Sequence, residues 1–296
     1  MSERVLLINF PDGIEYRKVL VTEGWIEVVY SSEEDTNFPV LSETIGETFN
    51  ISKPKPLIGG GETFQREGSP YWYCYLKEGH DLFMCLPTDE LTEADLFYDY
   101  RARKPRFYES EDEREFMSNC MEALKRKPEK GFVWIPAFEP TLGEDGILQI
   151  VPDCELNLHG DCEQFNKLCE EYSPKNGSTM AQIHTYFLLA VSWLKHGIAT
   201  VEQLVHNSSQ IGHYSDSPNH KAGYEVTGQR EFGGVFGYIG NSQIIVKNQA
   251  VSTGYSYVGG SRISSNGGKC SFSYVEKVHF PNYNFYNDVP LLELKG

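Results

Sequence analysis

The first residues of the chain form short, mainly apolar runs separated by turn-forming residues, which is a pattern typical of β-strands. Three such runs, residues 5–10, 16–21 and 25–30, are bounded by turn-forming residues and predict a small antiparallel β meander. Two further apolar runs, residues 71–76 and 81–86, predict a second strand pair. Residues 53–66, which lie between the meander and this strand pair, contain prolines and a run of glycines, and we expect a linker or a long loop there.

After residue 110, the apolar residues have the spacing of helices. Ser110 and Glu113 have the spacing of a capping box, and apolar residues repeat on one face behind them. Asp161 is expected to cap a second helix that ends near residue 174. A third helix is expected from Ser178 or Thr179 to a terminating Gly197, and Thr200 opens a short fourth helix. Apolar stripes of this kind are typical of core-facing helices.

A polar segment, residues 125–131, is broken by Pro128 and separates the predicted strands from the later helices. Composition of this kind is typical of a domain boundary. We therefore expect two domains, residues 1–130 and residues 131–296. The first would be a β-rich module for attachment or assembly.

Four segments carry a family resemblance. Residues 131–139 read GFVWIPAFE, residues 178–194 read STMAQIHTYFLLAVSWL, residues 233–243 read GGVFGYIGNSQ, and residues 257–262 read YVGGSR. They resemble motifs of formylglycine-generating-enzyme-like proteins of the phage and prophage type, a branch of the C-type lectin fold, with Ala137 where the family has Arg. The signature positions are Gly233, Gly234, Gly240, Asn241, Gly259, Gly260 and Ser261.

The resemblance covers residues 131–290 and implies an α+β fold class. An N-terminal antiparallel β module would be followed by a C-type-lectin-like domain of two helices and short glycine-rich strands. The oxidase members of the family hold copper with two cysteines near the C-terminus. Here Cys270 has no second cysteine after it, and the closing motif of the family is missing, so an oxidase is disfavoured.

The composition of the chain limits the kinds of partner that we expect it to bind. The chain has 296 residues and a formal net charge of −16, which argues against nucleic acid and anionic membranes as partners. The longest apolar stretch is far shorter than the roughly 20 residues that a membrane span needs, and no signal peptide is recognisable. We therefore expect synthesis in the cytoplasm of a host cell. The odd count of 7 cysteines favours free thiols.

No cofactor or metal site is predicted from the residues. Cys154, Cys162 and Cys169 lack the close spacing of zinc ligands, and the nucleophile and phosphate-binding motifs of common enzymes do not occur. Carboxylate pairs are uninformative in a chain with 42 acidic residues. A structural calcium ion is left open, because the residues do not specify a site for it.

The candidate recognition residues lie in two loops rich in Tyr, Ser, Asn and Gly. Tyrosine supplies large contact area at low entropic cost, and the small polar residues supply adaptable hydrogen bonds. The candidates are Tyr214, Asn219, His220, Tyr224, Tyr283, Asn284 and Tyr286. The alternative interpretation is that both loops are ordered connections without a ligand.

Together these features favour a non-enzymatic structural protein of a phage virion, in a tail, a fibre or a head decoration. Its lectin-like domain would display a surface or bind a receptor. The expected partners are other virion proteins, further copies of the same chain in a homo-oligomer, and a glycan or protein on the host surface. Two alternatives remain: a formylglycine-generating-enzyme-like oxidase with a lost or rebuilt site, and a bacterial protein that binds glycans or proteins.

Overall fold

The computed structural model describes residues 2–10, 13–22, 25–30, 40–44, 51–77, 79–99, 102, 104–212, 226–228, 230–260, 271–286 and 288–296. For residues up to 44, and for residues 104, 105 and 286, it describes the backbone alone. The described chain is of the mixed α and β class, with five helices and several antiparallel sheets.

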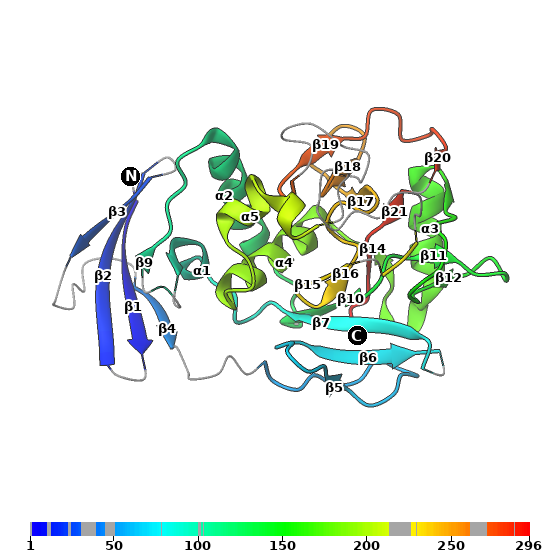
Figure 1. Ribbon diagram of the computed structural model, residues 1–296, viewed down its shortest axis with the longest axis horizontal. Helices are drawn as coiled ribbons and strands as arrows, with labels where there is room; N and C mark the ends of the chain where they lie inside the picture. Colours follow the sequence, from blue (N-terminus) through cyan, green and yellow to red (C-terminus); the bar gives the residue numbers. More distant parts are fainter. Residues whose placement is uncertain are drawn as a thin grey trace.

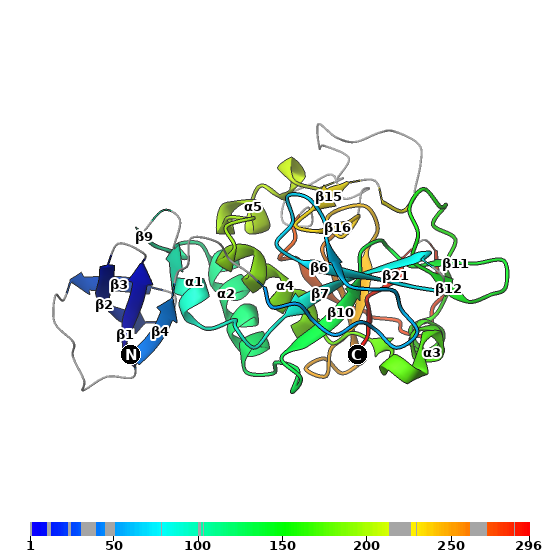
Figure 2. The same cartoon turned by 90° about the horizontal axis from the view of Figure 1, so that it is seen from below.

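The N-terminal strands form a separate sheet at one end of the long axis of the molecule (Figures 1 and 2). Its strands are β1 (Ser2–Phe10), β2 (Gly13–Thr22), β3 (Trp25–Tyr30) and β4 (Val40–Thr44). The first three pair in antiparallel order, which confirms the predicted meander. The sequence did not predict β4, which pairs in parallel with β1 and contacts helix α1 (Ala94–Phe97).

A second sheet crosses the middle of the molecule. Its order is β10–β7–β6–β5, and every pair is antiparallel. The strands are β5 (Phe64–Gln65), β6 (Trp72–Leu76), β7 (Asp81–Pro87) and β10 (Phe132–Pro136). Every residue of β7 is buried, as expected of a central strand covered on both faces. The predicted strand pair at residues 71–76 and 81–86 is thus confirmed, and β10, inside the motif at residues 131–139, belongs to the same sheet.

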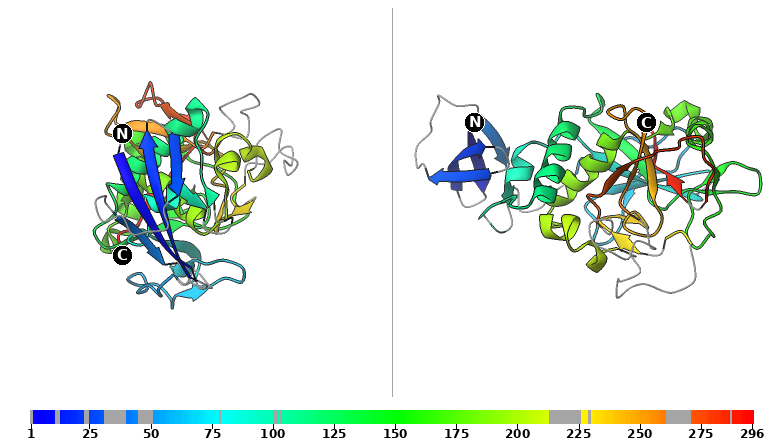
Figure 3. Two further views of the ribbon diagram at one scale, coloured as in Figure 1. Left: turned by 90° about the vertical axis from the view of Figure 1, so that its left-hand side faces the viewer. Right: turned by 90° about the horizontal axis from the view of Figure 1, so that it is seen from above.

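The four α-helices that follow residue 110 lie in two places: three of them lie together near one end of this sheet, and the second along the chain lies at the other end (Figures 2 and 3). They are α2 (Glu111–Leu124), α3 (Cys162–Tyr172), α4 (Ile183–Lys195) and the short α5 (Val201–Val205). Capping boxes begin α2, α3 and α5 at Ser110, Asp161 and Thr200, which confirms these predicted starts. Helix α4 is buried nearly all round and packs against α2, and it is therefore the central helix of the core.

The predicted start of the third helix is wrong. Helix α4 begins at Ile183, because Thr179 and Met180 form strand β14 (Thr179–Met180) with β22 (Leu292–Glu293). Its end is as predicted, since Gly197 has φ of 61° and terminates the helix in the left-handed region. A two-residue strand whose partner lies near the end of the chain leaves no local signal.

The glycine-rich half forms short strands. A hairpin joins β15 (Glu231–Phe232) to β16 (Val235–Phe236), and the third sheet has the order β19–β18–β17–β21. The strands of that sheet are β17 (Ile244–Lys247), β18 (Tyr255–Val258), β19 (Val275–Lys277) and β21 (Val289–Pro290). Smaller pairs join β8 (Tyr98–Asp99) to β9 (Lys104–Pro105), β11 (Thr141–Leu142) to β12 (Leu148–Gln149), and β13 (His159–Gly160) to β20 (Phe285–Tyr286).

Residues 53–66 are a packed loop rather than a linker. Leu57 is buried, and the main chain of Ile58 binds the side chain of Asn176 at both its N–H and its C=O. The loop therefore belongs to the same folded unit as the helices. Its prolines and glycines shape a loop path, and they do not mark a flexible joint.

The hydrophobic core crosses the predicted domain boundary near residue 130. Strand β10 lies after that position and pairs along its length with β7, which lies before it. One cluster of buried residues extends from Ile51 to Leu294. This packing favours a single folded unit from residue 51 to the last residue described.

We predict that a fragment of residues 51–296 unfolds cooperatively and that a fragment of residues 131–296 does not. The shorter fragment lacks β6 and β7, which would leave β10 and its buried Trp134 exposed. Urea titrations followed by circular dichroism would measure this. Cooperative unfolding of the shorter fragment would instead support two domains with a boundary near residue 130.

Candidate functional site

The structure describes only part of the predicted recognition loops. Tyr214, Asn219, His220 and Tyr224, together with the signature residue Ser261, lie outside the described residues. In the second loop, the side chains of Tyr283 and Asn284 are exposed, and Tyr286 lies in β20 with its backbone alone described. The candidate site can therefore be built from the second loop and its surroundings.

Two glycines of the signature, Gly233 and Gly234, occupy positions where a side chain would not fit. Gly233 and Gly234 turn the β15–β16 hairpin with φ of 58° and 90°. Trp193 Nε1 donates to Gly233 O at 3.0 Å, and Tyr73 Oη donates to Gly234 O at 3.0 Å. A Cβ atom at Gly233 would lie 2.0 Å from Trp193 Nε1, so this turn is pressed against the central helix.

A buried carboxylate joins two of the motifs that carry the family resemblance. Glu139, which is only 1% exposed, ends the segment that contains β10. Asn241 Nδ2 donates to Glu139 Oε1 at 2.6 Å, and the N–H of Gly228 lies 3.3 Å from Oε2. A Cβ atom at Gly237 would lie 2.0 Å from the carboxyl carbon of Glu139. Glycine is therefore required at position 237 for this carboxylate to be enclosed.

Burial raises the pKa of Glu139 to about 7, while the hydrogen bonds from Asn241, Gly228 and Ser242 act in the opposite direction. Desolvation disfavours the charged form of a carboxyl group more strongly than these donors favour it. The group is enclosed by protein on all sides, so we interpret it as a structural element that fixes the loop around Asn241 and not as a ligand-binding group.

Exposed aromatic side chains gather beside the third sheet. Phe280 is 75% exposed and Tyr283 is 65% exposed. The ring centroid of Tyr283 lies 6.2 Å from that of Phe285, which in turn lies 5.8 Å from Tyr257 in a T-shaped arrangement. With His279, these residues line a shallow cavity of about 260 Å³. We call Tyr257, His279, Phe280, Tyr283 and Phe285 the aromatic surface.

The segment that carries the aromatic surface is held at both ends. At the start of the segment, strand β19 pairs with β18. At its end, strand β20 pairs with β13. Between them the N–H of Tyr283 donates to Phe280 O at 3.0 Å, and Pro281 O accepts from the N–H of Cys162 at 3.0 Å. The exposed rings are thus presented by an ordered turn, which lowers the entropic cost of binding a partner.

Sequence reasoning identified Tyr283 but missed Phe280 and Tyr257. Burial raises the pKa of Tyr257, with the carboxylate of Asp288 adding to the effect, so its hydroxyl stays protonated and can both donate and accept. The sequence does not indicate that Phe280 is exposed, because Phe280 lies two positions after Val278, which is the spacing of apolar residues on one face of a strand. The proline at 281 is the one local feature that could have indicated a turn there.

The six cysteines of the described part of the chain are free thiols, as predicted for them, and all except Cys154 are buried. Burial raises the pKa of Cys74, Cys85, Cys120, Cys162 and Cys169, which disfavours their reactive thiolate forms. Cys270 lies outside the described residues.

Among the described residues, one group has the composition of a metal site: Glu113, Glu202 and His206, with ligand atoms within 4.8 Å of one another. Each already has a role in local structure. Glu113 completes the capping box of α2, Glu202 accepts from the side chain of Asn207, and His206 Nε2 lies 3.3 Å from Ser110 Oγ. We interpret this group as surface contacts between α2 and α5.

Comparison of the chain with protein-family models, with curated proteins and with solved structures gives no match. The family resemblance therefore rests on the four sequence segments alone. Within the described residues, no helix combines the length and the apolar character needed to cross a membrane.

We predict that Glu139 makes the protein less stable as the pH rises from about 4.5 to 7. The unfolded state loses its proton near 4.5, whereas the folded state keeps it up to about 7. Across this window the loss of free energy of unfolding should be about 3 kcal/mol. Because a glutamine cannot ionise, Glu139→Gln should remove this part of the pH dependence.

Urea unfolding of both proteins at several pH values measures the effect. The informative quantity is the difference between parent and variant, since the other carboxyl groups are common to both. A difference that stays constant from pH 4 to pH 8 would contradict the assignment.

Proposed function

We propose that the protein is a non-enzymatic structural component of a phage virion, in a tail, a fibre or a head decoration, and that it uses the aromatic surface to bind a partner. The observation that carries this proposal is the pair of exposed rings, Phe280 and Tyr283, on a turn anchored by strands at both ends. Aromatic residues on a rigid support are typical anchors of protein recognition.

The C-type-lectin-like arrangement of the second half belongs to this proposal. It is supported by the way in which the two motifs meet: Glu139 from one binds Asn241 from the other, and Tyr238 Oη donates to Pro136 O at 2.6 Å. Packing of this kind is what a shared domain signature requires. Gly233 of the signature adds a further contact, because its C=O accepts a hydrogen bond from Trp193 of the central helix.

The partner that fits the aromatic surface is a protein or a glycan. Exposed rings supply apolar contact area, and Tyr257 and His279 supply hydrogen-bonding groups beside them. The net charge of −16 opposes binding to phosphate backbones. Further copies of the same chain and other virion proteins are proposed as neighbours in the particle.

We predict that replacing both Phe280 and Tyr283 by alanine weakens attachment of particles to host cells, or incorporation of the protein into particles, by about tenfold or more. Losing a ring that fills a partner pocket typically costs roughly 2 kcal/mol or more. The rings are largely exposed, so the temperature of unfolding should change little.

Phe107→Ala is the matched control, because Phe107 is also an exposed ring but does not line the aromatic surface. It should attach and assemble like the parent. If the double variant behaves in the same way as this control, the aromatic surface is not the recognition site, and the loop at residues 213–225 would be tested next.

A chemical prediction separates this proposal from an oxidase. The purified protein supplied with copper should not oxidise a cysteine-containing peptide, because the sequence offers no second cysteine after Cys270 to complete a thiolate pair. Oxygen consumption is the measurement. Turnover that disappears in Cys270→Ser would contradict the non-enzymatic proposal.

A further inference from the structure

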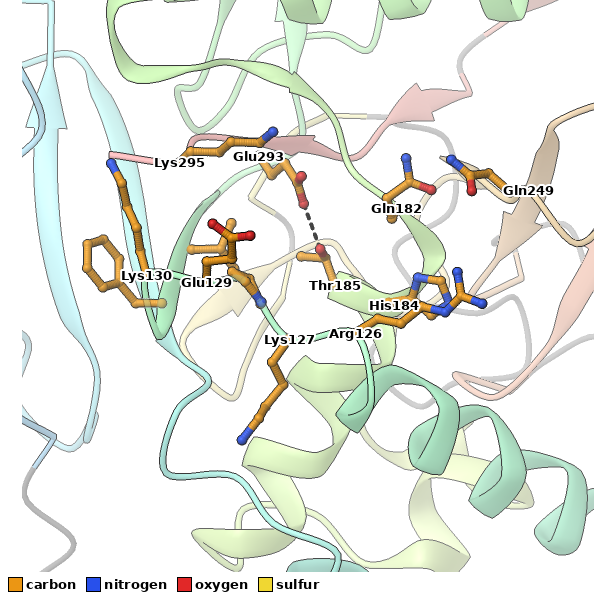
Figure 4. A pocket seen from close by; sticks show the side chains of 13 residues that line it. Arg126, Lys127, Glu129, Lys130, Gln182, His184, Thr185, Gln249, Glu293 and Lys295 are labelled. Carbon is orange, nitrogen blue, oxygen red and sulfur yellow. Dashed lines mark hydrogen bonds between the residues drawn. The ribbon is translucent and has the colours of Figure 1, made fainter.

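A cavity of about 490 Å³ lies between the segment that follows α2, the first turn of α4 and strand β22 (Figure 4). Its volume falls in the range of roughly 300–1,000 Å³ that is typical of small-molecule sites. It shares no lining residue with the aromatic surface. Any ligand of this cavity would therefore bind independently of the partner proposed above.

The floor of the cavity contains a buried carboxylate. Glu293, from β22, is 8% exposed, and Thr185 Oγ1 from α4 donates to its Oε2 at 2.6 Å. A carboxylate can accept about four hydrogen bonds, and among the described residues Thr185 is the one donor to it. Burial raises the pKa of Glu293, while Thr185 and the nearby lysines oppose that change. The group thus has capacity for further hydrogen bonds.

Four polar side chains around this carboxylate make no hydrogen bond or ion pair within the part of the chain that the structure describes. They are Gln182, His184, Gln249 and Lys295. Figure 4 places them around the Glu293–Thr185 pair. Burial and the nearby Arg126 lower the pKa of His184, so its ring is neutral at pH 7 and offers one donor and one acceptor.

The other cations of the cavity are already engaged. Lys127 Nζ donates to Asp89 O and Leu91 O, and Lys130 Nζ donates to Gly296 O. Arg126 Nε donates to Glu122 Oε1 at 2.8 Å. Lys295 is therefore the cation of the cavity that remains available to a ligand.

The charge of the cavity is opposite in sign to that of the chain. Its lining holds four cationic side chains and two carboxylates, and with Arg126 paired to Glu122 the balance is a small positive charge, within a protein of net charge −16. A concave site lined mainly by one sign of charge concentrates ligands of the other sign. An anionic ligand is thus favoured at this site and disfavoured over most of the remaining surface.

The remaining lining groups indicate the rest of the ligand. Side-chain amides, a neutral imidazole and a carboxylate together both donate to and accept from hydroxyl groups. Pro128, Phe132 and Val133 form an apolar wall suited to the C–H face of a ring. We propose that this cavity binds an acidic mono- or disaccharide, with Lys295 on its carboxylate or phosphate group and Glu293 accepting from its hydroxyls.

Isothermal titration calorimetry of the full chain tests the proposal with D-glucuronate, glucose 6-phosphate and glucose as probes. We expect at least one of the two anionic sugars to bind about tenfold or more tightly than glucose, and the comparison between them distinguishes carboxylate from phosphate. In Lys295→Met this preference should fall by about tenfold, as expected for the loss of a charge-assisted hydrogen bond.

Lys167→Met is the matched control, since Lys167 is an exposed lysine of α3 that lies outside the cavity and, among the residues that the structure describes, pairs with Glu171. It should retain the affinity of the parent. Glu293→Gln should weaken the binding of all three sugars. If this buried substitution disturbs folding, Gln249→Ala replaces it, because position 249 is exposed.

Two results would overturn the proposal. One is the absence of saturable binding of either anionic sugar up to about 10 mM. The other is equal affinity in Lys295→Met and Lys167→Met, which would place the binding elsewhere on the protein.

Discussion

The carboxylate of Glu139 is enclosed by residues between Gly228 and Ser242, which lie far from it in the sequence, and the glycine-rich half depends on that enclosure. Asn241 and Ser242 contribute side-chain donors, Gly228 contributes an N–H group, and Gly237 leaves the space that the carboxylate occupies. A buried acid without donors would cost several kcal/mol. The conformation that supplies these donors is therefore strongly favoured over alternatives, and it fixes the path of the chain between β15 and β17.

The C-terminal segment then connects this half to the rest. Strand β21 adds to β17 in parallel, β22 pairs with β14, and Leu294 exchanges two main-chain hydrogen bonds with Trp134 of β10. One short stretch of chain thus joins the third sheet, the start of the central helix and the second sheet. Phe280, Tyr283 and Phe285 of the aromatic surface lie on the chain shortly before this segment, so the exposed rings are close in sequence to these connections.

Local features could be predicted from the sequence, and distant pairings could not. The capping boxes at Ser110, Asp161 and Thr200 depend on residues three positions apart, and each begins a helix. Strands β4 and β14 were missed, because two to five residues carry no periodic signal without their partners. The polar segment at residues 125–131 indicated a boundary, yet β7 and β10 pair across it.

The candidate site shows the same contrast between local features, which could be predicted, and distant contacts, which could not. Tyr283 was predicted from loop composition, and Asn241 from the signature. The bond between Glu139 and Asn241 joins positions 102 residues apart, and the cavity around Glu293 gathers side chains from three elements. No sequence pattern reports such convergence, because it depends on how the elements pack and not on spacing along the chain.

The proposal that this scaffold displays a recognition surface in a virion is open to a direct test. The most direct test is quantitative mass spectrometry of purified particles released by cells that carry this gene. The account predicts that the chain is present in a fixed number of copies per particle, in constant ratio to the other structural proteins across preparations. Its absence from particles that are otherwise complete would contradict the account.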